Sequence, residues 1–305
     1  MSTALVFPGQ GAQYVGMGQS LCDGSCSARE IFAAAEKLLG ASFLHACFDG
    51  PFEILAQTKI CQPALFVHGC AATVVLREKF TKKKYSVAYG LSLGELTALW
   101  AADVFDFDVA LRVVAERGRL MQKACEETDG AMLCLIGGTR EDVETLCAET
   151  NVELANINCP GQIVISGMRN SIKAANEIAE KMRFRRVLQL NVAGAYHSRL
   201  MESACVGFEK FLKTIDLRPP KVATLTNVTG EPVSDPAKIK KTLAEQIISP
   251  VFFEKCCRSA IGIGADEFLE CGPGKSLCGM MKKISETVNV KNFDKMDDFD
   301  YGNSP

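Results

Sequence analysis

One serine of this chain stands in a pattern that can turn its hydroxyl into a nucleophile. Ser92 is the centre of a Gly-x-Ser-x-Gly motif, which follows a strand-like apolar run and precedes a helix-like run from Glu95 to about Ala102. A sharp turn from strand to helix lifts such a hydroxyl clear of the sheet, and the backbone N–H of the next residue, Leu93, can then face a developing oxyanion. The motif arises by chance in about one chain in ten of this length, so other residues must support it.

A nucleophilic serine needs a base, and His197 is the best candidate among the three histidines of the chain. It follows Gly194 and Ala195, whose small side chains let the backbone approach another element closely. A lone histidine is more often a hydrogen-bonded core residue, but pairing with an elbow serine favours the catalytic interpretation. His45 and His68 have no such signal. No carboxylate is marked as a third member, so a backbone carbonyl is expected to orient the imidazole of a Ser–His dyad.

A second oxyanion-hole amide is expected from the turn at 9–11, because its two glycines free the backbone to point N–H groups inward. A dinucleotide-binding fingerprint is excluded there, since Tyr14 stands at the third glycine position. The run 272–276 resembles part of a phosphate-binding loop, but Leu269 replaces its first glycine, so a tight turn is the better interpretation.

Arg117 is the other residue that could act on a substrate. It falls on the apolar stripe of a long predicted helix, 108–125, three and four residues after Val114 and Val113. A buried guanidinium needs an anion. A structural ion pair or a side chain that reaches solvent is as acceptable as a substrate carboxylate, for which arginine offers two-point recognition.

The predicted helices and strands that must position these residues follow two different orders along the chain. Up to residue 128, helices alternate with short apolar strands, which predicts an α/β core with a mostly parallel sheet. From 130 to 190 the order is β-α-β-β-α-β, which is the ferredoxin-like arrangement. We therefore predict a discontinuous core of 1–128 and 194–290, an inserted ferredoxin-like subdomain of 129–193, and an acidic tail of 291–305 that we expect to be mobile.

Composition excludes several functions. The formal net charge of −2 provides no bulk field for nucleic acid or a membrane surface, so neither partner is expected. The 14 cysteines are scattered and form no Cys-x-x-Cys, and with only three histidines a metal site is not expected. Free thiols fit a reducing compartment. The N-terminus lacks a secretory pattern, so we expect the cytoplasm, or an organelle stroma or matrix after removal of a transit peptide.

Taken together, the motifs are similar to those of the malonyl-CoA:acyl carrier protein transacylases and the related acyltransferase domains of polyketide synthases. The resemblance covers about Leu5 to Lys283. It rests on the following segments in order: Phe7-Pro8-Gly9-Gln10-Gly11-Ala12-Gln13, Gly90-Leu91-Ser92-Leu93-Gly94-Glu95, Arg117-Gly118-Arg119-Leu120-Met121-Gln122, Asn156-Ile157-Asn158-Cys159-Pro160-Gly161-Gln162, Tyr196-His197-Ser198-Arg199-Leu200-Met201, Gln246-Ile247-Ile248-Ser249-Pro250-Val251 and Glu270-Cys271-Gly272-Pro273-Gly274. It implies an α/β-hydrolase-like core that carries a ferredoxin-like insertion.

The resemblance implies roles for particular residues. Ser92 would be the acylated nucleophile and His197 its base. Gln10 and Leu93 would supply the oxyanion-hole amides, and Arg117 would bind the malonyl carboxylate.

Further positions are implied with less direct roles. The main-chain carbonyl of Gln246 would orient the base, and Asn156 and Asn158 would lie near the cleft. Leu91 replaces a histidine that many family members carry, so reliance on the arginine is expected to be greater here. Tyr196 is aromatic, which in the polyketide enzymes accompanies malonyl rather than methylmalonyl preference.

The implied reaction is a ping-pong transfer from malonyl-CoA to the phosphopantetheine thiol of a holo acyl carrier protein, with no bound cofactor and no metal. The basic run 183–186, with Lys282 and Lys283, is either a surface for an acidic carrier or a solvated basic face. Alternatives are a trans-acting polyketide acyltransferase, a serine thioesterase or hydrolase, and a non-catalytic scaffold. The absence of a heptad pattern favours a monomer.

Overall fold

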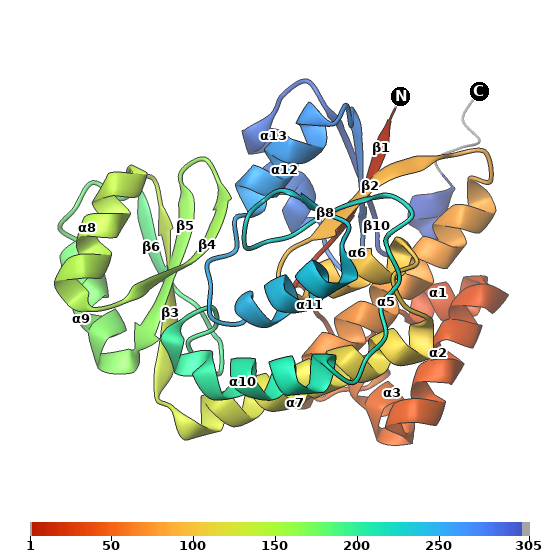
Figure 1. The fold of residues 1–305 in the computed structure, drawn as a ribbon, viewed down its shortest axis with the longest axis horizontal. Helices are drawn as coiled ribbons and strands as arrows, with labels where there is room; N and C mark the ends of the chain where they lie inside the picture. Colours follow the sequence, from red (N-terminus) through yellow and green to blue (C-terminus); the bar gives the residue numbers. More distant parts are fainter. Residues whose placement is uncertain (1, 301–305) are drawn as a thin grey trace.

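The computed structural model describes residues 2–300 and contains two separate sheets (Figure 1). The larger sheet has six strands in the order β10-β9-β1-β2-β7-β8, of which only β8 runs antiparallel to its neighbour. The strands are β1 (Thr3–Phe7), β2 (Tyr85–Gly90), β7 (Ala223–Leu225), β8 (Pro232–Val233), β9 (Glu267–Cys271) and β10 (Asn289–Phe293). The prediction of a mixed α/β chain with a mostly parallel sheet is confirmed.

Thirteen α-helices and two short 3-10 helices accompany the strands within the described part of the chain. They are α1 (Gln19–Gly24), α2 (Cys26–Leu39), α3 (Ala41–Phe48), α4 (Phe52–Leu55), α5 (Thr58–Lys79), α6 (Leu93–Ala101), α7 (Phe107–Glu127), α8 (Arg140–Thr150), α9 (Arg169–Ala179), η1 (Arg199–Met201), α10 (Glu202–Leu212), α11 (Pro236–Glu245), α12 (Phe253–Gly262), α13 (Ser276–Ile284) and η2 (Met296–Phe299).

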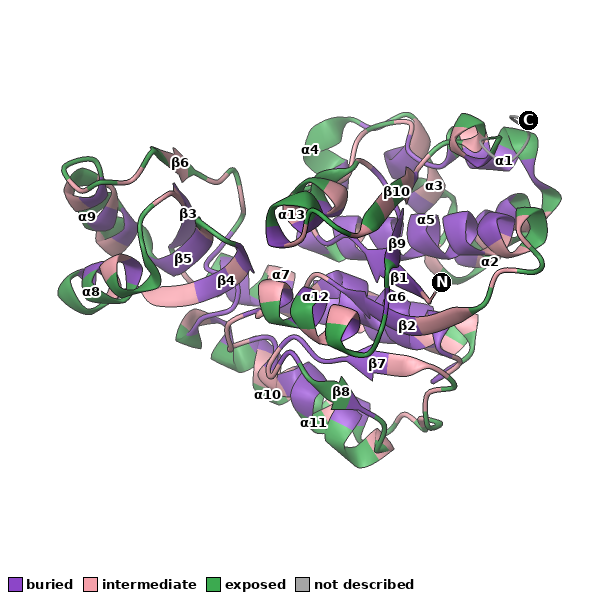
Figure 2. Ribbon diagram, turned by 90° about the horizontal axis from the view of Figure 1, so that it is seen from above, coloured by how far each residue is buried: buried purple, intermediate pink, exposed green. Residues whose placement is uncertain are grey.

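Both faces of the large sheet are covered, which is why the central strand β1 is apolar from Ala4 to Phe7. Leu5 and Phe7 of β1 belong to the core under α5, α6 and α7, whereas Ala4 and Val6 belong to a second core under α12 and α13. Figure 2 shows these strands as buried ribbons between the helices. Burial on both faces fixes the sheet and gives its strand ends a rigid position.

The smaller sheet is antiparallel throughout, in the order β4-β5-β3-β6. Its strands are β3 (Gly130–Ile136), β4 (Glu153–Cys159), β5 (Gln162–Met168) and β6 (Arg186–Gln189), and α8 and α9 are the helices between them in sequence. Thr139 and Asp142 form the capping box at the start of α8, as their spacing predicts. The sheet lies to one side of the larger one (Figure 1).

Several contacts attach the small sheet to the larger unit, among them the packing of β4 on α12 and α13. The edge strand β4 pairs with Val251, whose N–H donates to Ala155 O at 2.9 Å and whose carbonyl accepts from Ile157 N at 2.9 Å. The segments by which the chain enters and leaves the small sheet lie side by side. A Cβ added at Gly130 would lie only 2.4 Å from Ala195 N. The two hydrogen bonds with Val251 hold β4 against the segment that follows α11.

The prediction of a mobile tail is wrong for residues 291–300. Residues up to Phe293 complete β10, and Phe299 of η2 is buried with its ring centroid 4.9 Å from that of Phe293. The acidic residues act as local acceptors, since Asp298 receives the N–H groups of Asp294 and Lys295 at 2.9 and 2.8 Å. The acidic composition of this segment therefore did not indicate that it is packed against the fold. Residues 301–305 of the predicted tail lie outside the described residues.

Helix α5 begins at Thr58, so Pro63 lies inside it. By length and composition this helix is apolar enough to cross a membrane, but 83% of its apolar window is buried inside the fold. Such burial is typical of the central helix of a globular domain.

Candidate active site

Ser92 lies on the sharp strand-to-helix turn that the motif predicts. Strand β2 ends at Gly90, Ser92 has a φ of 52°, and α6 begins at Leu93. A Cβ at Gly94 would lie 2.1 Å from Phe7 O, and one at Gly90 would lie 2.2 Å from the backbone of Gly94. The two glycines are therefore required for the turn to pack against β1. Although Ser92 is the N-cap residue of α6, its hydroxyl makes no capping bond and remains available for chemistry.

His197 is placed as a base for this hydroxyl. Its Nε2 lies 2.8 Å from Ser92 Oγ, and its Nδ1 lies 2.7 Å from the main-chain oxygen of Gln246. Because a carbonyl only accepts, Nδ1 carries the proton and Nε2 is left to accept the serine proton. Burial, with a smaller effect of the Arg117 charge, lowers the pKa of His197 to about 4, so the imidazole is neutral near pH 7.

Arg117 is buried with 1% of its surface exposed, and it faces the nucleophile. It donates from Nη1 to Gln62 Oε1 at 2.7 Å, and from Nη2 to Gln246 Oε1 at 2.8 Å and Ser92 Oγ at 3.1 Å. Burial lowers the pKa of Arg117 to about 10, which leaves it charged at neutral pH. Among residues 2–300 it makes no direct ion pair, and its side chain does not reach solvent. Neither structural alternative named above therefore describes this arginine, whose charge faces neutral groups.

The two predicted oxyanion-hole residues, Gln10 and Leu93, line the same cavity as Ser92. Leu93 is the first residue of α6, so its N–H has no acceptor within the helix. Gln10 lies in the loop that follows β1, and its side-chain Nε2 donates to Tyr196 Oη at 3.2 Å. The tyrosine hydroxyl also lies 2.5 Å from Thr58 Oγ1, which fixes the loop against α5.

A cavity of about 250 Å³ opens between the two sheets at this point. All the predicted site residues except Gln246 line it, including Asn156 and Asn158 from β4, while α13 contributes Leu277 and Met280. The side-chain oxygen of Asn158 is buried and has no hydrogen-bond partner among the described residues, so it is available to a ligand. The sequence-predicted residues therefore converge on one cleft.

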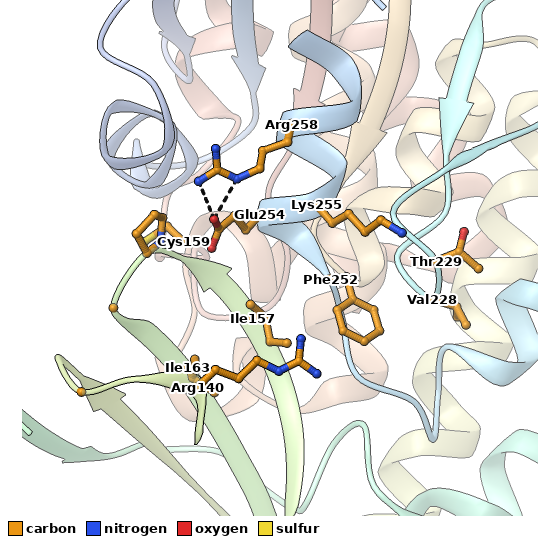
Figure 3. Close-up of a pocket in the computed structure, with 13 residues that line it drawn as sticks. Arg140, Ile157, Cys159, Ile163, Val228, Thr229, Phe252, Glu254, Lys255 and Arg258 are labelled. Atoms are coloured by element: carbon orange, nitrogen blue, oxygen red, sulfur yellow. Dashed lines mark hydrogen bonds and ion pairs between the residues drawn. The ribbon is translucent and has the colours of Figure 1, made fainter. Parts of the chain in front are cut away.

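A larger cavity, of about 690 Å³, lies on the other side of β4 (Figure 3). Ile157 and Cys159 line it from β4, alternating with the two asparagines that face Ser92. Its three cationic side chains are engaged in ion pairs: Arg140 with Glu144, Lys255 with Glu231 and Arg258 with Glu254. It holds neither a serine nor a histidine, and we place the reaction in the smaller cavity.

Three buried side chains of the site were not predicted from the sequence as site residues. Gln62 accepts from Arg117, Asn227 Oδ1 accepts from Ser92 N at 2.7 Å, and Glu95 accepts from Gln246 Nε2 at 2.6 Å. Glu95 stands within the elbow motif, and a carboxylate inside an otherwise apolar helix is the one hint that the sequence offers. In the part of the chain that the structure describes, no group of three or more His, Cys, Asp or Glu residues is placed to hold a metal ion.

Comparison with known proteins shows the family of this chain. Residues 4–293 match the family model described as the acyl transferase domain. The malonyl CoA-acyl carrier protein transacylase of Bacillus subtilis (strain 168) is 36% identical over 294 residues, which are 94% of this chain and 92% of that protein.

Solved structures are equally similar. An acyl carrier protein S-malonyltransferase from Vibrio cholerae has a TM-score of 0.94 and 34% identity, with 99% of each chain covered. The malonyl-transacylase PlMCAT, solved in complex with the type II polyketide synthase acyl-carrier protein AntF, has a TM-score of 0.94 and 33% identity over 98% of each chain. This chain belongs to the acyl transferase domain family.

Proposed function

We propose that this protein transfers the malonyl group of malonyl-CoA to the phosphopantetheine thiol of a holo acyl carrier protein, through a malonyl ester on Ser92. The similarity to malonyl transacylases supports the substrate class. The observation that carries the proposal is the buried guanidinium of Arg117, whose Nη2 lies 3.1 Å from the hydroxyl of Ser92. A charged group at that place suits an acyl group that ends in a carboxylate.

The first half-reaction loads the enzyme. Ser92 Oγ attacks the thioester carbon while His197 Nε2 takes its proton, and the oxyanion receives the N–H groups of Leu93 and Gln10. The carbon–sulfur bond then breaks, and the imidazolium returns the proton to the departing thiol of coenzyme A. The main-chain oxygen of Gln246 stabilises the imidazolium through Nδ1–H.

The second half-reaction repeats these steps with a new thiol. The phosphopantetheine thiol gives its proton to His197 and attacks the ester carbon, and the serine oxygen leaves with that proton. Neither half-reaction changes an oxidation state, so the chemistry requires no redox cofactor. A ping-pong pattern of initial rates follows from the shared acyl-enzyme.

Selectivity for malonyl follows from the cost of leaving Arg117 without an anion. A neutral acyl group would desolvate the guanidinium and provide no charge in return. Leu91 lines the cavity and is apolar, so it adds no second polar contact for the carboxylate. Tyr196 is held by Gln10 and Thr58. The resemblance to the polyketide enzymes, in which an aromatic residue at this position accompanies malonyl preference, supports malonyl rather than methylmalonyl.

The carrier is proposed to dock on a basic rim, which we define as Arg183, Arg185, Arg186, Lys282 and Lys283. These side chains are exposed, and none takes part in an ion pair among residues 2–300. Arg185 and Lys283 line one hollow of about 360 Å³ between the small sheet and α13. Because α13 also lines the reaction cavity, the rim borders the cleft that leads to Ser92.

Chase kinetics test the proposal. Enzyme loaded with malonyl-CoA and freed of coenzyme A should pass its acyl group to added holo carrier faster than to water, and initial-rate plots should be parallel. Release of malonate that outpaces transfer would instead identify a hydrolase. The similarity to PlMCAT favours polyketide carriers as a second candidate, which the ratio of kcat/KM for the two carrier types decides.

The finer description of the fold is also a proposal. The strand order β4-β5-β3-β6 supports a ferredoxin-like subdomain at 129–193, and the doubly covered parallel sheet supports an α/β-hydrolase-like core. The core consists of 1–128 and 194–290, to which β10 and η2 add residues up to 300. We propose a monomer in the cytoplasm, or in an organelle stroma or matrix.

A further inference from the structure

A buried carboxylate lies directly behind the nucleophile, and the mechanism above does not use it. Glu95 of α6 has 2% of its surface exposed. Its Oε2 accepts the backbone N–H of Asn227 at 2.9 Å and the side-chain Nε2 of Gln246 at 2.6 Å. Both donors belong to residues that contact the reacting groups. The carboxylate is therefore connected to the site through one hydrogen bond from Asn227 and one from Gln246.

Gln246 is the first connection. An ionised carboxylate only accepts and a guanidinium only donates, so the Gln246 amide must turn its NH₂ toward Glu95 and its oxygen toward Arg117. The reversed amide would place its NH₂ against the donors of Arg117 and its oxygen against the acceptor oxygen of Glu95. The main-chain oxygen of the same residue accepts from His197 Nδ1 at 2.7 Å. One residue, oriented by Glu95, therefore touches both the base and the carboxylate-binding arginine.

Asn227 is the second connection. Its side-chain oxygen accepts from Ser92 N at 2.7 Å, and its Nδ2 donates to Gly90 O at 2.8 Å, so it holds both ends of the nucleophile turn. Its backbone N–H is the group that Glu95 binds. The carboxylate thus supports the serine turn as well as the histidine and the arginine.

We propose that Glu95 is a positioning residue for acyl transfer: its ionised carboxylate fixes the Gln246 amide and the Asn227 turn, and through them holds Arg117, His197 and Ser92 in register. The inference rests on the proposed malonyl transfer. Burial raises the pKa of Glu95 to about 7, while the Asn227 and Gln246 hydrogen bonds and the Arg117 charge lower it from a still higher value.

The pH dependence of acylation follows from these groups. Glu95 binds a proton as the pH falls below about 7, and a protonated carboxyl no longer compels the Gln246 amide to keep its orientation. His197, with a pKa of about 4, is lost as a base only at lower pH. The other titratable groups that act on Glu95 are Arg117 of α7, which stays charged, and Cys256 of α12, whose raised thiol pKa keeps it neutral. The rate should therefore fall in two steps.

The test compares Glu95→Gln with the wild-type protein in single-turnover acylation by malonyl-CoA from pH 4 to 9. The variant keeps the shape and one acceptor oxygen but loses the charge. We expect the acylation rate constant near pH 8 to fall about tenfold and the step near pH 7 to disappear.

Glu267→Gln is the matched control, because Glu267 is also buried but bonds Thr3 and Lys83 away from the cleft. It should lower the melting temperature without changing the rate or the pH profile. A Glu95→Gln variant with wild-type rate and both pH steps would overturn the inference. Failure of the wild-type protein to form any malonyl ester would instead overturn the proposed function.

Discussion

At the scale of single residues, the site depends on a charge that the fold keeps without a direct counter-ion. Arg117 is buried, and its nearest partners are the neutral oxygens of Gln62, Gln246 and Ser92. Such an arrangement is costly unless an anion arrives with the substrate. In the proposed reaction, the carboxylate of the acyl group provides the charged partner that Arg117 lacks in the free enzyme.

The first prediction concerns this arginine. Arg117→Ala should lower the rate of Ser92 acylation by malonyl-CoA about 100-fold, and should leave acylation by acetyl-CoA little changed, because only malonyl loses a charge-assisted contact. Arg119→Ala is the control on the same helix, since its side chain is 57% exposed and pairs with Glu116. Equal loss for both acyl groups would show that Arg117 acts on the nucleophile rather than on the carboxylate.

Sequence patterns predict the reacting residues but not the groups behind them. Ser92 and His197 are recognisable because their residue types and local glycines are unusual, although they are 105 positions apart. Arg117 is recognisable because it interrupts an apolar stripe. Asn227 and Gln62 are ordinary polar residues in ordinary positions, and only the tertiary contacts reveal that they hold the turn and the guanidinium.

At the scale of elements, the turn between β2 and α6 limits what its glycines can become. A side chain at Gly94 would collide with the carbonyl of Phe7, which lies 2.1 Å from the added Cβ. Because that oxygen belongs to a central strand buried on both faces, it cannot move without disturbing the core. The helix would have to shift and carry the oxyanion-hole amide of Leu93 with it.

The second prediction follows from this collision. Gly94→Ala should destabilise the fold by at least about 2 kcal/mol in urea unfolding and should abolish acylation. Gly279→Ala is the matched control, because Gly279 lies inside α13 and an added Cβ there meets open space. It should stabilise the protein by about 0.5–1 kcal/mol. A Gly94→Ala variant as active as the wild type would show that the turn is not constrained as described.

Elements with strong periodicity or capping were predictable, and the irregular ones were not. The capping box of Thr139 and the alternating strands of the small sheet follow from local chemistry. The C-terminal strand did not, since its pairing with β9 gives order to a segment whose acidic composition suggests the opposite. Pro63 lies inside α5, where a proline is a local signal against a helix, and tertiary packing stabilises the turn before it.

At the scale of the whole molecule, the proposed path of the substrate arm runs from a basic surface into the cleft between the two sheets. The basic rim lies at its border, and the reaction cavity inside contains one buried cation. In the proposed function, long-range attraction at the rim affects how fast an acidic carrier arrives, and the contacts within the cavity determine which acyl group reacts.

The third prediction separates these two tasks. Arg185→Glu with Lys283→Glu should slow discharge of the malonyl-enzyme by holo carrier at least about tenfold at low salt, with a smaller effect at high salt. Loading should use malonyl-N-acetylcysteamine, which avoids the phosphates of coenzyme A. Discharge by free pantetheine should not change.

Lys37→Glu on α2 is the control for charge reversal outside the cleft, and it should behave like the wild type. Equal slowing with carrier and with pantetheine would place the defect inside the cavity rather than at the rim.

The central claim is that Ser92 carries the malonyl group as a covalent ester. Intact-protein mass spectrometry after mixing with malonyl-CoA, followed by peptide mapping, measures this most directly. We predict one malonyl group per chain on the peptide that contains Ser92, and none on the Ser92→Ala variant. An unmodified wild-type protein, or an adduct that persists in Ser92→Ala, would contradict the account.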